Sequence, residues 1–207
     1  MLRDTAVARV QMLLGFKTGQ DANVIQAMKE AQEQLENAIE LPDFLRINYD
    51  DPFTTTIDEH VVDVPDNFIR EWEQDQLNVV VNDVTTNLSK DELGYLRIRY
   101  PDSGVPIKYA LVNKQFHLYP LPDQEYTLTG TYYARDVLLN TNIQNKWLEH
   151  VPELLISMAG IVMAASLRDD KALPVFAAIQ QEAKMKVALL TSANDAAGSK
   201  PVIGGEN

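Results

Sequence analysis

The sequence predicts an α+β protein. Two N-terminal and two C-terminal helices would form a four-helix core, which carries an inserted small antiparallel β module and a flexible C-terminal arm. Apolar residues recur at helical spacing near both ends of the chain, and alternating apolar and β-branched runs fill its middle. Apolar residues make up 45% of the 207 positions, enough for a packed core. Because amphipathic helices must cover each other's apolar stripes, we expect the helical ends to meet and the β part to be an insertion.

The N-terminal region predicts two helices. The first covers Thr5–Phe16. The second begins near Asp21 or Asn23, whose side chains are good helix caps, and runs to about Glu40 before Pro42 stops it. The apolar stripes are Val7, Val10 and Leu14 in the first helix and Val24, Met28, Ala31, Leu35 and Ala38 in the second. These stripes predict a helical hairpin with one buried face.

The region after Pro42 predicts strands, with one stretch left open. Phe53–Val64 is rich in threonine and β-branched residues, which favours a strand. Phe68–Val81 combines helical spacing at its start with a strand-like Leu-Asn-Val-Val-Val run, so both structures remain possible there. Asp83–Asp91 predicts a polar loop, and the alternation in Tyr95–Tyr100 predicts a strand that ends in a turn.

Three further strands predict an antiparallel meander. The expected strands are Pro106–Leu111, Phe116–Tyr119 and Glu125–Arg135. Asn113 and Lys114 fit a two-residue hairpin turn between the first two. Pairing is expected to end at Pro120 and Pro122, because proline has no N–H to donate to a ladder.

The C-terminal region predicts two more helices and an arm. Asn145–Leu167 is apolar on almost every side, which indicates a central helix, and Lys171–Leu190 is amphipathic. The end of the chain is rich in glycine, serine and alanine, with Pro201, Val202 and Ile203 as its apolar residues. The predicted organisation is a helical hairpin at 1–45, a β-rich module at 46–140, a second hairpin at 141–193 and a flexible arm at 194–207.

Composition excludes several classes of protein. The chain has no cysteine, so it has no disulfide, thiolate metal site or thiol nucleophile. Its net charge of −12 opposes tight phosphate binding and suits a wall past which DNA slides. The apolar N-terminus is interrupted by Arg9, which argues against a signal peptide. The most apolar stretch, Leu154–Ala165, is shorter than the roughly 18 residues of a membrane span, so we expect no membrane partner.

The sequence contains no familiar catalytic or metal-binding motif, so we expect neither an enzyme nor a cofactor. The chain lacks a glycine-rich phosphate loop, a nucleophile elbow and a zinc-binding helix motif. His60 lies among acidic residues, but we interpret it as part of a partly solvated strand edge, since no second ligand pair has metal spacing. His117 and His150 are expected at the surface or beside a neighbouring strand, and the paired carboxylates fall in predicted turns.

One aromatic and basic stripe predicts a docking surface. Tyr95, Arg97 and Arg99 would share one face of the strand expected at 95–100. Such residues can hold a single nucleic-acid strand. In a chain this acidic, docking to an acidic neighbouring subunit is the better interpretation.

The segment LYPLPDQEYTLTGTYYA resembles a segment of tailed-bacteriophage head-to-tail adaptor proteins. The residues that match its pattern are Leu118, Pro120, Pro122, Asp123, Tyr126, Tyr132 and Tyr133. Three further segments are similar to that family: Val64–Phe68, Gly104–Ala110 and the start of the long helix with Asn145, Trp147, Leu148, Pro152 and Glu153. The resemblance extends over about Asp21–Leu190.

The resemblance implies a structural protein of the virion neck, present in the host cytoplasm during assembly. Such a protein forms a cyclic ring, a dodecamer, beneath the portal protein and carries the tail nozzle or tail tube, while viral DNA passes through without specific binding. The expected interface residues are Tyr95, Arg97, Arg99, Tyr119, Pro120, Pro122, Tyr126, Tyr132, Tyr133, Pro201, Val202 and Ile203. The alternative is a soluble module that binds a sugar or peptide through its β part.

Overall fold

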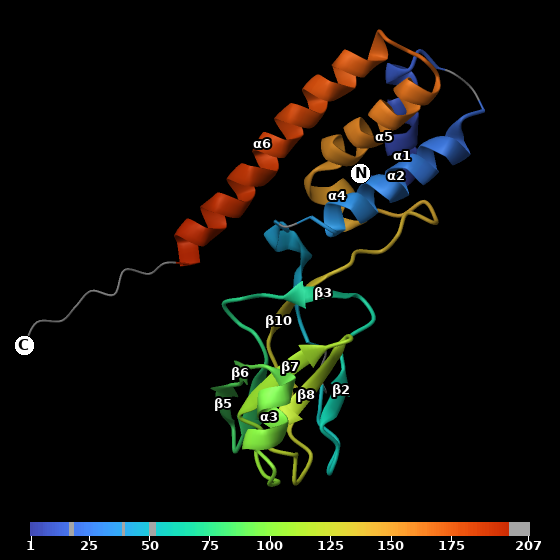
Figure 1. The fold of residues 1–207 in the computed structure, drawn as a ribbon. Coiled ribbons are helices and arrows are strands. Elements are labelled where there is room, and N and C mark those ends of the chain that lie inside the picture. The colour runs from blue at the N-terminus through green and yellow to red at the C-terminus, as the bar shows by residue number, and fades with distance from the viewer. Residues whose placement is uncertain (17–18, 39, 50–52, 199–207) are drawn as a thin grey trace, which may run out of the picture. The chain divides into compact units, whose positions relative to one another are not determined.

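A computed structural model describes residues 1–16, 19–38, 40–49 and 53–198, with side chains to residue 188 (Figure 1). Within these residues the chain forms six α-helices, a short 3-10 helix and ten strands in three sheets. The predicted fold of a four-helix core with a small β insert is therefore wrong. The chain divides into two compact units: Met1–Leu45 with Asp136–Asn207, called here the helical unit, and Arg46–Arg135, the β unit.

The helical unit contains five of the six α-helices. They are α1 (Arg3–Leu13), α2 (Asp21–Glu36), α4 (Lys146–His150), α5 (Pro152–Ser166) and α6 (Ala172–Gly198), with the 3-10 helix η1 at Asp43–Leu45. The helix predicted at Asn145–Leu167 is two helices, because the proline ring at Pro152 starts a new helix just after α4 ends. The predicted arm from residue 194 also differs, since α6 continues to Gly198.

Helix α5 is the centre of this unit. It packs against α1, α2, α4 and α6, and more than half of its residues are buried, although Val162 is exposed. Its contact with α6 is close: a Cβ on Gly160 would lie 2.2 Å from the buried ring of Phe176. Glycine at this position therefore lets the two helices approach each other.

A buried carboxylate joins distant segments of the helical unit. Glu36, at the end of α2, is 1% exposed. Its Oε1 accepts hydrogen bonds from Gln32 Nε2 at 2.9 Å, the backbone N–H of Asp136 at 3.1 Å and Trp147 Nε1 at 3.2 Å. Asn145 extends the cluster, since its Nδ2 donates to Gln32 Oε1 at 3.0 Å. The residues that re-enter this unit after the β unit are thereby fixed to α2.

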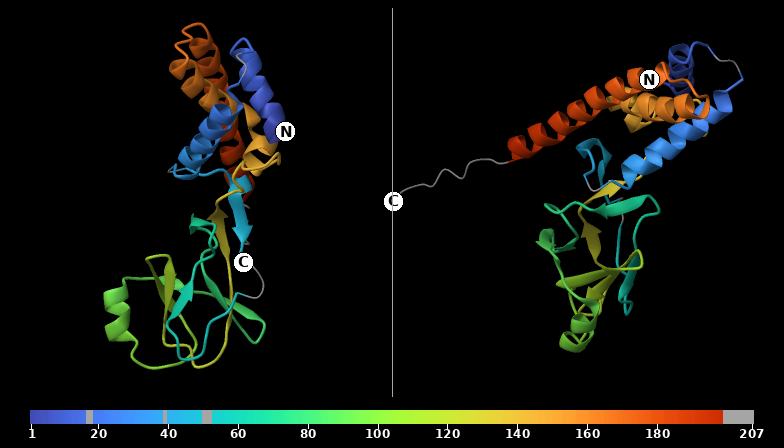
Figure 2. Two further views of the ribbon diagram at one scale, coloured as in Figure 1. Left: turned by 90° about the vertical axis from the view of Figure 1, so that its right-hand side faces the viewer. Right: turned by 45° about the horizontal axis from the view of Figure 1, so that its top comes forward.

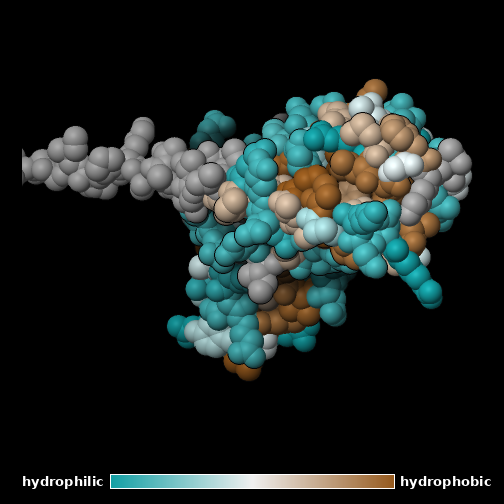
Figure 3. Space-filling view, turned by 90° about the horizontal axis from the view of Figure 1, so that it is seen from above, coloured by the Kyte–Doolittle hydropathy of each residue, from teal (hydrophilic) through white to brown (hydrophobic). Residues whose placement is uncertain are grey.

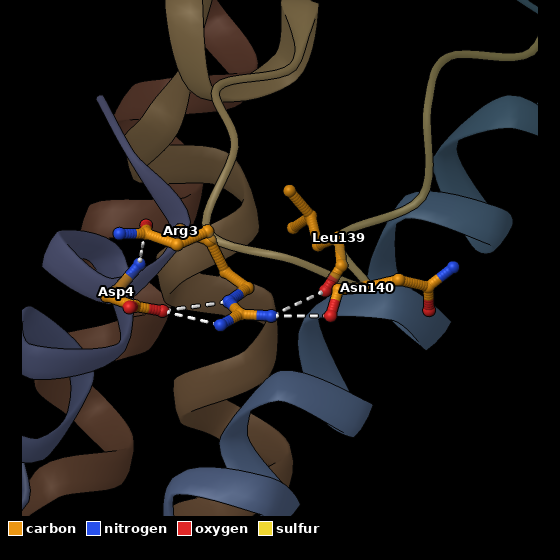
Figure 4. Close-up of polar contacts among 5 residues, drawn as sticks. Arg3, Asp4, Leu139 and Asn140 are labelled. Carbon is orange, nitrogen blue, oxygen red and sulfur yellow. Dashed lines mark hydrogen bonds and ion pairs between the residues drawn. The ribbon is translucent and has the colours of Figure 1, made fainter.

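The first turn of α1 is held by the same returning segment (Figure 4). The Arg3 guanidinium lies between the Asp4 carboxylate and two carbonyls, donating to Asn140 O at 2.8 Å and Leu139 O at 3.4 Å. The backbone N–H of Arg3 also donates to Ile143 O at 2.9 Å. These bonds satisfy N–H and C=O groups that the helix and loop ends would otherwise leave unpaired.

Apolar side chains remain exposed on the helical unit. A patch of them, bordered by polar residues, is visible in the face shown in Figure 3. The large exposed apolar residues of this unit are Leu2, Met12, Phe16, Val137, Leu138, Val162, Val175 and Met185.

The β unit contains three small sheets and helix α3 (Leu93–Arg99). Sheet order is β1-β10-β3 in the first, β2-β8-β7-β6 in the second and β5-β4-β9 in the third. The strands are β1 (Arg46–Asn48), β2 (Val61–Asp63), β3 (Phe68–Glu71), β4 (Asn78–Val81), β5 (Val84–Asn87), β6 (Ser89–Lys90), β7 (Lys108–Val112), β8 (Gln115–Tyr119), β9 (Thr127–Thr129) and β10 (Thr131–Ala134). All pairings are antiparallel except that of β6 with β7.

Several predictions for this unit are wrong in detail. The strand predicted at Tyr95–Tyr100 is helix α3, and the predicted loop Asp83–Asp91 contains strands β5 and β6. The open stretch Phe68–Val81 forms two strands. The strand predicted at Glu125–Arg135 is split at Gly130, whose φ of +144° suits glycine and where a Cβ would lie 1.9 Å from the backbone oxygen of Gln76. A single residue therefore moves the chain from one sheet to another.

Aromatic rings fill the core of the β unit. Tyr49 stacks on Phe53 and on Tyr132, with 4.8 Å between ring centroids in each pair, and Phe116 meets several of these rings edge-on. Beside them, Glu71 is buried and accepts hydrogen bonds from Tyr109 Oη and Lys90 Nζ. Burial is the main cause that raises the pKa of Tyr109, followed by the Glu71 carboxylate.

We predict that Gly160→Ala lowers the free energy of unfolding by about 2 kcal/mol. Forcing a methyl group into the Phe176 ring costs up to about 3 kcal/mol, which outweighs the roughly 1 kcal/mol that alanine gains over glycine in a helix. Urea denaturation followed by circular dichroism measures the difference. Gly94→Ala is the matched control: its Cβ would meet nothing within 4 Å, so stability should rise by up to about 1 kcal/mol. Equal stability of the two variants would contradict the packing described for α5 and α6.

We predict opposite effects for two tyrosine-to-phenylalanine changes in the β core. The buried Tyr49 hydroxyl has no hydrogen-bond partner among the described residues, so Tyr49→Phe should raise the free energy of unfolding by about 1 kcal/mol. Tyr109→Phe removes a hydrogen-bond donor from the buried Glu71 carboxylate and should lower the free energy of unfolding by about 1–3 kcal/mol. The same denaturation measurement applies, and a loss of stability in Tyr49→Phe would show that its hydroxyl is paired.

Candidate functional site

Helix α3 lies outside the strands of the β unit (Figure 2). It packs on β7 and β8 around Leu96, its one fully buried residue, which contacts Ala110 and Tyr119. Leu93 and Tyr100 lie at either side of this contact and are partly buried. Their spacing of three and four residues from Leu96 is that of a helix face. The remaining α3 side chains are exposed to solvent.

The helical structure changes which predicted site residues lie together. Tyr95, Arg97 and Arg99 are all exposed, but residues two apart in a helix do not share a face. Tyr95 is instead grouped with Ile98 and Arg99, at spacings of three and four. Ile98 is 85% exposed and Tyr95 is 52% exposed. We call this set, with Arg97, the α3 surface.

The α3 surface is basic as well as apolar. Among the described residues, neither Arg97 nor Arg99 has an ion-pair partner. The charge of Arg97 affects His117 on the neighbouring strand β8. Burial is the main cause that lowers the pKa of His117, and the charges of Arg97 and then of His60 lower that pKa further. Exposed guanidinium groups beside exposed apolar side chains are typical of a surface that binds an acidic protein partner.

Ile98 was missed by sequence reasoning. The apparent alternation in Tyr-Leu-Arg-Ile-Arg-Tyr places Ile98 with Leu96, on the strand face opposite to Tyr95, Arg97 and Arg99. The signal for a helix was nevertheless present, because Leu93, Leu96 and Tyr100 have helical spacing and two acidic residues, Asp91 and Glu92, precede them.

Most tyrosines of the predicted interface are core residues within this chain. Tyr119, Tyr126 and Tyr132 are at most 4% exposed. The hydroxyl of Tyr126 donates to Asp123 Oδ1 at 2.6 Å, and that of Tyr132 donates to Asn67 Oδ1 at 2.9 Å. These residues stabilise the unit that presents the α3 surface, and they are not exposed anchors.

The proline corner has a defined backbone structure. The Tyr119–Pro120 peptide bond is cis, Pro122 is buried, and Leu121 between the prolines pairs with Ser103 through an isolated bridge. Tyr133 is half-buried with the Arg70 guanidinium 5.3 Å from the centre of its ring. The predicted site residues Pro201, Val202 and Ile203 lie outside the described residues.

A hollow of about 490 Å³ in the β unit is lined by residues of the third sheet, of strand β1 and of the loops beside them. Its lining is mainly hydroxyl and amide side chains, with the carboxylate of Asp75 among them. That carboxylate accepts hydrogen bonds from Asn78 Nδ2 at 2.9 Å and from Thr131 Oγ1 at 2.7 Å. Its aromatic lining residue, Tyr49, is 7% exposed, so its ring is packed in the core. The lining residues are Asn48, Tyr49, Asp75, Asn78, Thr85, Thr127, Leu128, Thr129 and Gly130.

The histidines and acidic residues do not form a metal site in the described residues. In the part of the chain that the structure describes, no three histidine, aspartate or glutamate residues are placed to hold a metal ion. His60 instead lies 2.8 Å from Leu118 O through Nδ1 and stacks on Tyr119. Of the described helices, none is long and apolar enough to cross a membrane.

Comparison with known proteins identifies the family. No curated protein matches the chain. The family described as SU10 adaptor protein matches it over residues 3–202, which is nearly its whole length and includes both the helical unit and the β unit. Adaptors are structural components of the virion, which implies a role other than catalysis. The chain therefore belongs to the SU10 adaptor protein family and is a bacteriophage head-to-tail adaptor.

Proposed function

We propose that the protein forms an oligomeric ring, a dodecamer, that docks beneath the portal protein, extends the DNA channel and attaches the tail nozzle or tail tube. Membership of the adaptor family over residues 3–202 is the observation that carries this proposal. In the assembled virion the protein would lie in the neck, at the interface of head and tail.

The charge of the chain supports a channel role. Its net charge of −12 gives a surface that, on average, repels DNA phosphates. A wall of this kind lets DNA pass without the counterion release that makes phosphate binding strong. DNA is therefore proposed as a passing molecule and not as a bound ligand.

The α3 surface is proposed as one of the ring or tail contacts. A closed ring uses head-to-tail contacts, so each copy needs two different complementary faces. Arg97 and Arg99 place positive charge at two positions around α3, on a chain in which acidic residues outnumber basic ones by 30 to 18. Tyr95 and Ile98 supply apolar area that a partner would bury. We propose that this surface binds an acidic face of a neighbouring subunit.

The proposed function is tested with a phage that lacks the gene for this protein. We expect such a phage to accumulate DNA-filled heads and separate tails, seen by electron microscopy, because the two parts have no connection. Supplying the protein from a plasmid should restore complete virions. Normal virions in the absence of the protein would refute the proposed function.

We predict that the double change Arg97→Glu and Arg99→Glu lowers the yield of infectious virions at least tenfold in this complementation assay. Reversing two exposed charges at a contact with an acidic partner replaces attraction by repulsion, which costs several kcal/mol. Lys171→Glu with Lys184→Glu is the matched control, with the same change in net charge at exposed positions of the helical unit. Full infectivity of the α3 variant would exclude this surface from assembly.

A further inference from the structure

Strand β5 is an edge of the third sheet, and no other strand of the described residues pairs with its outer side. That sheet has the order β5-β4-β9, and the far edge of β9 is covered, because Leu128 N donates to Phe53 O at 2.7 Å and Thr54 forms a bridge with Thr127. Strand β5 pairs with β4 on one side, and all four of its residues are exposed. An edge of this kind presents backbone N–H and C=O groups that another strand can bind.

The hairpin turn determines which backbone groups of β5 point outward. Asn82 and Asp83 both have positive φ, 49° and 63°, which is the pattern of a two-residue type I′ turn. Val81 and Val84, on either side of the turn, are then a hydrogen-bonded pair. Along an antiparallel ladder, hydrogen-bonded pairs alternate with pairs that are not hydrogen-bonded. The bond from Leu88 N to Leu77 O at 2.9 Å fits this alternation. The N–H and C=O of Thr85 and Asn87 therefore point away from β4.

The sequence of β5 contains no proline, lysine or other charged residue that would protect an edge. Lysine, inward charge and proline are common devices against unwanted pairing. Other edge strands of this unit carry a charged residue, such as Arg70 in β3 and Lys90 in β6. Strand β5 reads Val-Thr-Thr-Asn, with β-branched residues that favour pairing and with Val84 63% exposed.

The chain itself contains a segment suited to this edge. Residues 199–207 read SKPVIGGEN, in which Val202 and Ile203 form a short β-branched run bounded by proline and by two glycines. Extended, this segment would reach roughly 30 Å, more than the length of β5. Its Lys200 complements Asp83, which ends the hairpin turn beside β5 and has no ion-pair partner among the described residues.

We propose that the β5 edge binds residues 199–207 of a second copy of the chain by strand addition. The inference rests on the proposed ring, in which each copy needs a donor and a different acceptor. Main-chain hydrogen bonds from Thr85 and Asn87 provide the affinity, and the side chains of Val202 and Ile203 provide the preference for this segment. Each copy would thereby be tied to its neighbour through a contact separate from the α3 surface.

The test measures binding of a fluorescein-labelled peptide of residues 199–207 to the full-length chain by fluorescence anisotropy. The acceptor carries Val202→Asp and Ile203→Asp, so that its own terminus does not compete. We expect saturable binding that weakens about tenfold in a Thr85→Pro acceptor, because the loss of one edge hydrogen bond is worth about 1.4 kcal/mol. Thr85→Ala, which keeps the N–H, is the matched control and should bind within about twofold of the parent.

Two N-methylated peptides keep the proposal testable if Thr85→Pro disturbs folding. In an added strand only every second N–H faces the edge, so methylation at either Val202 or Ile203 should abolish binding while methylation at the other is tolerated. Strand addition at β5 would be overturned if the two methyl groups had equal effects or if no saturable binding were seen. It would also be overturned if binding were lost on reversing the charges of Arg97 and Arg99. Binding of the whole protein to the portal ring is measured in a separate experiment. If the peptide does not bind but the protein still binds the portal, the strand-addition inference is refuted and the proposed function is not.

Discussion

The helical unit depends on the buried carboxylate of Glu36. The chain leaves this unit after Leu45 and returns at Asp136, so the unit must be closed by segments that are far apart in the sequence. Glu36 connects the segments before and after the β unit, because it lies in α2 and accepts hydrogen bonds from the Asp136 backbone and the Trp147 indole. A buried carboxylate is costly unless its oxygens are satisfied, and here the donors come from the elements that must meet. The same cluster orients Asn145, whose side chain caps α4.

The β unit uses a different principle, since its core is aromatic and its sheets are small. Stacked and edge-on rings around Tyr49, Phe116 and Tyr132 form one core with Val79 and Leu128 of the third sheet, so all three small sheets contribute to it. This core leaves two kinds of surface available for binding. One is the basic and apolar α3 surface, and the other is the edge of β5. A structural adaptor needs rigid surfaces of this kind, because its role is to hold other proteins in place.

The sequence predicted some elements well and others poorly, for physical reasons. Amphipathic stripes such as Val24, Met28 and Ala31 locate α2, because one helix face is buried. Alternation misled the prediction at 95–100, where a short helix rests on the single buried residue Leu96 and tertiary packing decides the structure. The polar strand β5 had no hydrophobic signal to predict it, since all four of its side chains are exposed. Arg97 and Arg99 were predicted as site residues because alternation placed them on one face of a strand, whereas the exposure of Ile98 follows only from the helix.

The most direct test of the adaptor role is the mass of the purified protein, measured by native mass spectrometry alone and after mixing with the portal ring of the same phage. We expect the protein to add to the portal in a fixed multiple that matches the number of portal subunits, because each portal subunit offers the same docking site. A protein that leaves the mass of the portal ring unchanged would contradict a ring that docks beneath the portal.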